Sequence, residues 1–207
     1  MPKTSAGVGA VLALTLVLTG CSLPAPAPEE TEQTAPVDEQ PESQPEETAQ
    51  SDFSFDTDPA TGIEIAGTGY TFRVPLGWQI PDAPEGYDPD ALAGDPNDTD
   101  GFADNVNVVV SPAGLLTPDQ IEQGSEEEMN AVGADSVETN ERVRVAGSET
   151  THLSTQITEQ GLTYLLEQYG VSSDEQTYVV TFSFSDTVSD ADRQALAESV
   201  LATWTWA

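Results

Sequence analysis

The alternation of apolar and polar residues predicts strands in the first part of the folded region. Residues 70–75, Tyr-Thr-Phe-Arg-Val-Pro, alternate and stop at a proline, which is typical of a strand. Leu76-Gly77 then predicts a turn, and residues 78–80 predict a short return strand. Residues 105–110 predict another strand. Residues 81–104 are rich in aspartate, proline and glycine, so we expect a long loop there.

The second half of the chain shows two further pairs of alternating segments. Residues 137–145 and 150–157 predict a hairpin around Ala146-Gly147-Ser148, and residues 162–169 and 178–184 predict a second one. Apolar residues in the second pair occupy both strand faces. In the strand at 178–184, one face carries Tyr178, Val180, Phe182 and Phe184. In the strand at 162–169, one face carries Leu162, Tyr164 and Leu166, and the opposite face carries Leu165 and Tyr169. Strands that are apolar on both faces predict a sheet covered on both sides.

Two segments have helical periodicity. Residues 118–132 have a narrow apolar face, with Thr117 as the expected N-cap and Pro118 at the first helical position. A last helix is expected to begin near Ser189, with Leu196, Val200 and Trp204 in one apolar stripe. The pattern therefore predicts one α+β domain over residues 58–207. Its expected architecture is an α/β/α sandwich with a mostly antiparallel sheet of six or seven strands and two main helices.

The N-terminus reads as a targeting segment. Lys3 precedes an apolar run over residues 8–18, and this run is too short for a bilayer core, which needs about 20 residues. Leu18-Thr19-Gly20-Cys21 then looks like a bacterial lipobox, and Cys21 is the chain's only cysteine. That resemblance implies cleavage of a signal peptide, residues 1–20, and acylation of Cys21. The alternative is a soluble secreted protein whose signal peptide happens to end in Gly-Cys.

Residues 21–57 predict an extended tether. Residues 22–52 contain six prolines, nine acidic residues and no basic residue. Such a segment buries too little apolar surface to offset its ordering entropy, and its like charges extend it. Phe53 and Phe55 mark the approach to the domain. As an alternative function, Thr31, Thr34 and Thr48 are candidates for glycosylation, as in other Thr/Pro-rich stalks.

Charge and composition exclude several classes of protein and site. The chain has 37 Asp and Glu against 5 Lys and Arg, a formal charge of −32. This field repels phosphate, which excludes a nucleic-acid partner. A single cysteine excludes an internal disulfide and any Cys-cluster metal site, and a single histidine excludes two-His zinc motifs. We therefore expect no cofactor and no metal ligands.

The candidate chemistry is sparse. His152 and Ser154 share one strand face, about 7 Å apart, too far for a direct hydrogen bond, so we expect a solvated histidine and no catalytic residues. The oxygen-rich residues 88–101 match a calcium-binding loop poorly, because the expected end ligands are absent. Arg142 and Arg144 are expected to pair with carboxylates, and recognition of an anionic group is the alternative.

Three stretches carry a resemblance to a known family. Residues 67–78 (Gly-Thr-Gly-Tyr-Thr-Phe-Arg-Val-Pro-Leu-Gly-Trp), residues 102–110 and residues 201–204 resemble the PsbP/Mog1-type domain, and within it the actinobacterial LpqN-type lipoproteins. The resemblance covers about residues 66–206. It implies a non-enzymatic accessory protein of the cell envelope, with lipid-like ligands in bacteria that contain mycolates.

Two function classes follow from these observations. The first is a lipid-anchored accessory or binding module on the extracytoplasmic face of the bacterial cell membrane, with an amphiphilic envelope lipid or an envelope protein as its partner. Trp204 and Trp206 would form an aromatic wall between the last helix and the sheet, with Phe102 in the loop that closes it. The second class is a structural or adhesive protein displayed on the surface. No set of nucleophile, base and orienting group favours an enzyme.

Overall fold

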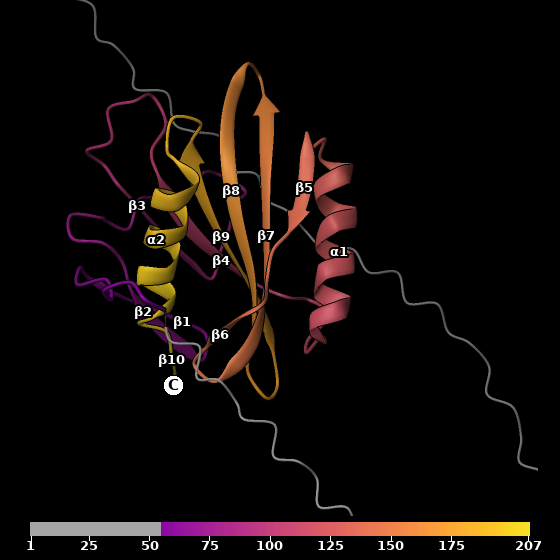
Figure 1. Cartoon of the computed structure of the whole chain (residues 1–207). Coiled ribbons are helices and arrows are strands. Elements are labelled where there is room, and N and C mark those ends of the chain that lie inside the picture. The colour runs from indigo at the N-terminus through magenta and orange to yellow at the C-terminus, as the bar shows by residue number, and fades with distance from the viewer. Residues whose placement is uncertain (1–54) are drawn as a thin grey trace, which may run out of the picture. The chain divides into compact units, whose positions relative to one another are not determined.

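The computed structural model describes residues 55–207, and the expected signal peptide (1–20), Cys21 and the acidic stretch up to residue 54 lie outside these described residues. Within residues 55–207, ten strands and two helices follow one another (Figure 1). Their bounds are β1 (Glu64–Gly67), β2 (Tyr70–Arg73), β3 (Ala91–Gly94), β4 (Asn105–Val110), α1 (Pro118–Ala131), β5 (Ser136–Thr139), β6 (Val143–Val145), β7 (Ser148–Glu159), β8 (Leu162–Ser172), β9 (Thr177–Ser185), α2 (Asp190–Leu201) and β10 (Thr205–Trp206).

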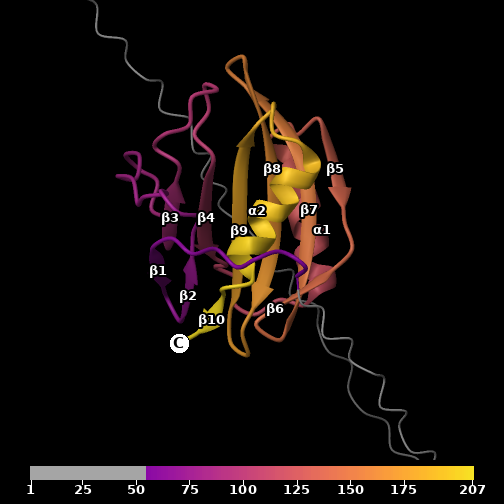
Figure 2. The same cartoon turned by 60° about the vertical axis from the view of Figure 1, so that its left-hand side comes forward.

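A seven-stranded antiparallel sheet forms the centre of the domain. Its strands lie in the order β3-β4-β9-β8-β7-β5, and β6 pairs with the first residues of β7. Helix α2 lies on one face of this sheet and α1 on the other, next to β5 and β7 (Figures 1 and 2). The expected α+β sandwich with two main helices and a mostly antiparallel sheet is confirmed.

A small second sheet joins the two ends of the domain. It has the order β1-β2-β10, and β10 places Thr205 opposite Thr71 and Trp206 opposite Tyr70. The backbone N–H of Ala207 donates to the carbonyl of Gly69 at 3.0 Å. Phe55 packs against the main core, while Phe53 lies outside the described residues.

The apolar residues pack into two clusters, one larger than the other. The main core lies between the sheet and α2 and contains Tyr70, Phe72, Phe182, Phe184 and Trp204, all nearly inaccessible to solvent. The second apolar cluster includes Met129 of α1. Its members are Phe102, Met129, Ile157, Tyr164 and Leu166. Strand β8 contributes side chains to both clusters, one on each face of the sheet. The sheet is therefore covered on both sides, as the apolar residues on both faces of this strand predicted.

The helix starts agree with the sequence. Thr117 caps α1 and forms a capping box with Gln120, and Ser189 caps α2 by accepting from the Asp192 N–H. Helix α2 ends at Leu201, however, so Trp204 does not continue the helical stripe. Trp204 follows a turn and is buried against the small sheet, because β10 must leave the helix direction to pair with β2.

The predicted loop at residues 81–104 is only partly a loop. It contains β3, which pairs with β4 along its whole length, and the expected return strand at 78–80 is reduced to a bridge between Gln79 and Gly94. Residues 91–94, Ala-Leu-Ala-Gly, have weak intrinsic strand preference. Hydrogen bonds to β4, rather than the sequence pattern of these four residues, make this segment a strand.

The predicted strand at 137–145 is interrupted. Strands β5 and β6 both pair with β7, and residues 140–142 between them do not continue the strand. Arg142 in this break forms ion pairs with Asp119 and Glu122 of α1. Because the strand is interrupted here, the Arg142 side chain extends from the edge of the sheet to α1.

The hairpins β6–β7 and β7–β8 each have a turn of two residues, and both residues of each turn have a positive φ. In the turn between β7 and β8, Gln160 has φ +52° and Gly161 has φ +84°. A left-handed conformation is unfavourable for most L-residues, and asparagine tolerates it best among those with a side chain. We expect Gln160→Asn to raise the free energy of unfolding by roughly 0.5–1 kcal/mol in urea denaturation. Gln160→Ala is the control and should give no such gain; an equal gain from alanine would contradict the turn argument.

Candidate functional site

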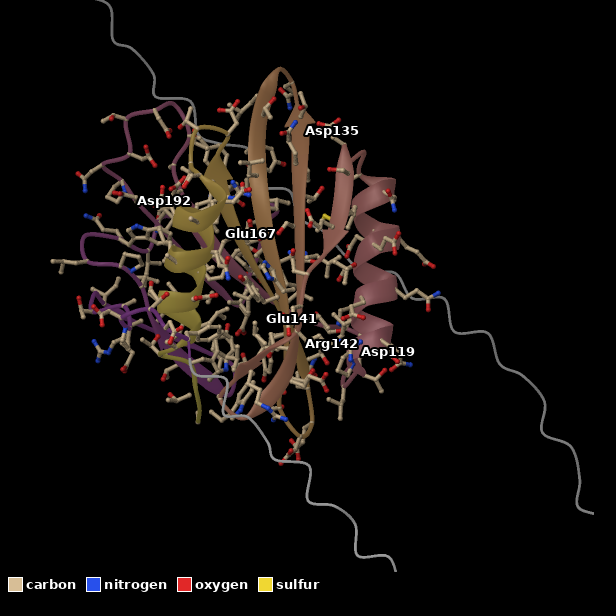
Figure 3. The ribbon with its side chains drawn as sticks, in the orientation of Figure 1. Asp119, Asp135, Glu141, Arg142, Glu167 and Asp192 are labelled. Carbon is tan, nitrogen blue, oxygen red and sulfur yellow. The ribbon has the colours of Figure 1, made fainter. Side chains whose placement is uncertain are left out.

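Four polar side chains meet between the sheet and α2, and we call them the Glu167 cluster: His152, Ser154, Glu167 and Arg193. The register of β7 and β8 places Ser154 directly opposite Glu167. One carboxylate oxygen, Glu167 Oε2, accepts from Ser154 Oγ at 2.5 Å and lies 2.7 Å from His152 Nε2. The other, Oε1, accepts from Arg193 Nε at 2.9 Å. Glu167, on β8, thus links β7 and α2. Figure 3 labels Glu167 next to α2.

Three of the four members of the cluster are almost completely buried, and Ser154 is half-buried. Glu167 is 3% exposed, Arg193 7% and His152 8%. The His152 ring stacks on Tyr169, with centroids 4.3 Å apart and planes 11° apart. Burial by itself would raise the pKa of Glu167, but the hydrogen bonds from His152, Ser154 and Arg193 outweigh it and hold that pKa below its usual value. The carboxylate is therefore charged at neutral pH.

Arg193 and Ser154 have further polar partners outside the cluster. Arg193 also forms an ion pair with the exposed Asp190 at 2.9 Å and donates to the Val188 carbonyl at 3.0 Å. Asn140 donates to Ser154 Oγ at 2.7 Å. Since a buried ion pair is favourable only when its remaining hydrogen bonds are made, this network is suited to holding α2 against the sheet.

The expectation of a solvated His152 is wrong. The face of β7 that carries His152 turns toward α2 and toward Glu167 on the neighbouring strand. Ser154 donates to the carboxylate and not to the histidine, so the carboxylate is the centre of the cluster. In a Ser-His-Asp triad the histidine holds that central position, between the serine and the carboxylate. The arrangement is that of a structural ion cluster.

Arg142 pairs with carboxylates, as expected. Its guanidinium contacts Glu122 at 2.7 Å, Asp119 at 2.5 Å and Glu149 at 3.2 Å. These hydrogen bonds raise the pKa of Arg142 above its usual value. Arg144 instead donates to the carbonyl of Gly147 at 3.1 Å. Figure 3 shows Arg142 between the edge of the sheet and α1.

The oxygen-rich residues near the start of β4 are used internally. Asp100 accepts from the Phe102 N–H at 3.1 Å, and Asp95 accepts from the Asn97 N–H at 2.8 Å. Among residues 55–207, no three His, Cys, Asp or Glu side chains gather closely enough to hold a metal ion. Over the same residues, no helix is long and apolar enough to span a membrane.

The structure does not bring the three aromatic candidates together. Trp204 is 3% exposed and lies in the main core, stacked on Tyr70 with centroids 4.2 Å apart. Trp206 is half-buried and contacts Trp204 and Tyr178. Phe102 belongs to the second apolar cluster, where it stacks on Tyr164 at 5.4 Å. A single wall formed by all three side chains is therefore absent among the described residues.

Sequence reasoning missed Glu167 and Arg193, although both leave a signal. Glu167 is the one charged residue in the apolar strand 162–171. Arg193 stands one turn before Ala197 on the buried face of α2. A charge on an apolar face predicts a buried partner of opposite sign, and these two residues match.

Comparison with known proteins gives similarities at the level of structure only. No family model matches the chain, and no curated protein matches it. LpqN, described as involved in cell envelope biogenesis of Mycobacterium tuberculosis, has 16% identity and a TM-score of 0.46 over 69% of this chain and 88% of its own. The cyanobacterial PsbP of Synechocystis sp. PCC 6803 has 18% identity and a TM-score of 0.49, covering 67% and 87%.

A third similar structure comes from Bacteroides thetaiotaomicron. It has 17% identity and a TM-score of 0.44 over 67% of this chain. This chain spans 45% of that protein's length. At identities of 16–18%, these similarities concern the path of the chain and not its function.

Proposed function

We propose that this chain is a lipoprotein of the bacterial cell envelope, held on the extracytoplasmic face of the membrane by an acylated Cys21. The observation that carries the proposal is Leu18-Thr19-Gly20-Cys21, where the chain's only cysteine ends a short apolar run. Each buried methylene of an acyl chain contributes about 0.8 kcal/mol, so two or three chains form a stable anchor. Residues 21–57, with the acidic, proline-rich stretch 22–52, are the proposed tether between anchor and domain.

In this proposal the folded domain is a non-catalytic accessory module. Two observations support that role: Glu167 already has three hydrogen-bond partners inside the domain, and Ser154 donates to it directly and not through the histidine. The proposed partners are the membrane, through the anchor, and an amphiphilic envelope lipid or an envelope protein, through the domain. LpqN, one of the proteins with a similar structure, is described as involved in cell envelope biogenesis.

Charge supports the choice of partner. Residues 55–207 contain 28 acidic side chains and four arginines. Three of these arginines, Arg73, Arg142 and Arg193, are held in ion pairs. A nucleic acid or an anionic bilayer surface is repelled by such a domain, whereas a neutral amphiphile or a basic protein is not.

Labelling with a radioactive fatty acid in cells that express the full chain tests the anchor. We expect label in the processed chain and recovery of that chain with the membrane fraction. Cys21→Ala should abolish the label and release any exported chain into the medium, because no other thiol is present.

Ser22→Ala, one residue further along, is the matched control and should label like the unchanged chain. A Cys21→Ala chain that still carries label would refute acylation at Cys21. An unchanged chain found free in the medium with an unmodified N-terminus would refute the anchor as a whole.

A further inference from the structure

The segment 95–104 crosses one end of the central sheet, and we call it the acidic strap. It connects β3 to β4, and its own ends are joined by a hydrogen bond from the Asp95 N–H to the Asp104 carbonyl at 2.9 Å. It reaches the end of β9 through two side chains. Asp104 Oδ1 accepts from the Ser185 N–H at 3.1 Å, and Asp100 Oδ2 accepts from Thr187 Oγ1 at 3.1 Å.

One apolar side chain of the acidic strap enters the interior. Phe102 is 7% exposed and lies in the second apolar cluster, with its ring stacked on Tyr164. The neighbouring Ala103 and Pro96 are exposed. The strap therefore covers the second apolar cluster with a single aromatic ring, and two carboxylates fasten it to the end of β9.

The same strap carries four carboxylates. Asp95, Asp98 and Asp100 repel a charge on Asp104. Asp104, Asp95 and Asp98 are half-buried, and Asp100 is exposed. From β9 and the turn after it, Ser185 and Thr187 contact the strap without charge, and Asp186 between them is exposed. Among residues 55–207, no arginine forms an ion pair with any of the four aspartates. The closed strap therefore holds like charges together without a balancing cation.

We propose that the acidic strap is a proton-controlled cover, closed over the second apolar cluster when Asp104 is protonated and loosened when Asp104 carries a charge. Opening withdraws Phe102 and exposes Tyr164, Leu166 and Met129. The device is independent of acylation at Cys21, and it gives the domain an apolar surface whose exposure depends on pH.

The direction of the pH effect follows from the two states of Asp104. Burial, together with the charges of Asp98, Asp100 and Asp95, raises the pKa of Asp104 to about 6, although the Ser185 N–H opposes this. In an open, solvated strap the carboxyl has its ordinary pKa of about 3.9. The closed form therefore binds the proton more tightly, so acid favours closing, and a rise in pH through 6 favours opening. Between pH 5 and pH 7 the opening equilibrium should shift by up to about tenfold.

Amide hydrogen exchange, measured at pH 5 and pH 7 on the chain from residue 21 onward, tests this proposal. Protection factors, which remove the intrinsic pH dependence of exchange, should fall by up to about tenfold at the Phe102, Asp104 and Ser185 amides between pH 5 and pH 7. The central amides of β8 and β9, at Val171 and Val180, should change far less. Equal protection at both pH values, or an equal loss at the central amides, would overturn the proposal.

Asp104→Asn separates charge from hydrogen bonding. Asparagine keeps an oxygen that accepts from the Ser185 N–H but cannot become charged. In this variant we expect strap amides protected equally at both pH values. Asp174→Asn, in the exposed turn at the opposite end of β9, is the matched control and should keep the pH dependence of the unchanged chain. A pH dependence retained in Asp104→Asn, or lost in Asp174→Asn, would contradict the role of Asp104.

Discussion

Glu167→Gln is expected to lower the free energy of unfolding by about 3–5 kcal/mol at pH 7, because it leaves the buried Arg193 without its buried counter-charge. Glutamine keeps the size of the side chain, so the loss comes from charge and hydrogen bonding and not from a cavity. The remaining partner of Arg193, Asp190, is exposed and screened by solvent, and it replaces little of the lost interaction. Urea denaturation of both proteins measures the difference.

The effect of Glu167→Gln should also depend on pH. Since the pKa of Glu167 is lowered in the folded domain, its contribution is present above the unfolded pKa of about 4.3 and is lost as the pH falls through the folded value. The difference between the two proteins should therefore be full at pH 7 and shrink below about pH 4.

Two further variants make the test of the Glu167 cluster selective. Glu175→Gln, on an exposed turn, is the matched control and should change stability by less than about 0.5 kcal/mol. The double change Glu167→Leu with Arg193→Met removes both charges and should cost less than Glu167→Gln alone. If Glu167→Gln costs no more than Glu175→Gln, the cluster does not hold α2 to the sheet.

Trp204→Ala is the second change with a large expected effect, about 3–5 kcal/mol of unfolding free energy. The indole lies parallel to Tyr70 at 4.2 Å and to Phe72 at 5.5 Å, and Tyr178 meets it edge-on at 6.3 Å. Its removal leaves a cavity where the small sheet meets the main core.

Trp206→Ala provides a comparison, because it removes a second tryptophan only two residues further along the chain. Trp206 is half-buried and contacts the cluster from its edge, so we expect a loss of about 1 kcal/mol. Thermal or chemical denaturation of the two variants gives the ratio of the two losses. Similar losses for both tryptophans would contradict the assignment of Trp204 to the interior and of Trp206 to its rim.

Local pattern predicted the elements that are long and strongly periodic. Helix α1 and its Thr117 cap, helix α2 and its Ser189 cap, and strands β4, β8 and β9 were all expected from periodicity and capping residues. Strands β3 and β10 were not expected. They have four and two residues, and each is held by hydrogen bonds to another strand, β3 to the next strand β4 and β10 to the much earlier β2.

The candidate site was harder to predict than the fold. His152 and Ser154 were placed on the same strand face correctly, but their burial depends on Glu167 and Arg193, which reach them from other elements. Glu167 and Arg193 are 26 residues apart and follow different periodicities. A single sequence shows each charge on an apolar face, but the pairing itself is a property of the tertiary fold.

Strand β10 sets an order on the folding of the domain. The small sheet needs both β2 and β10, whose paired residues Thr71 and Thr205 are 134 positions apart along the chain. The indole that stacks on Tyr70 belongs to Trp204, directly before β10. During synthesis on the ribosome, neither this indole nor the third strand of the small sheet is present until residues 204–206 have been made, so the small sheet is completed after every strand of the central sheet has left the ribosome.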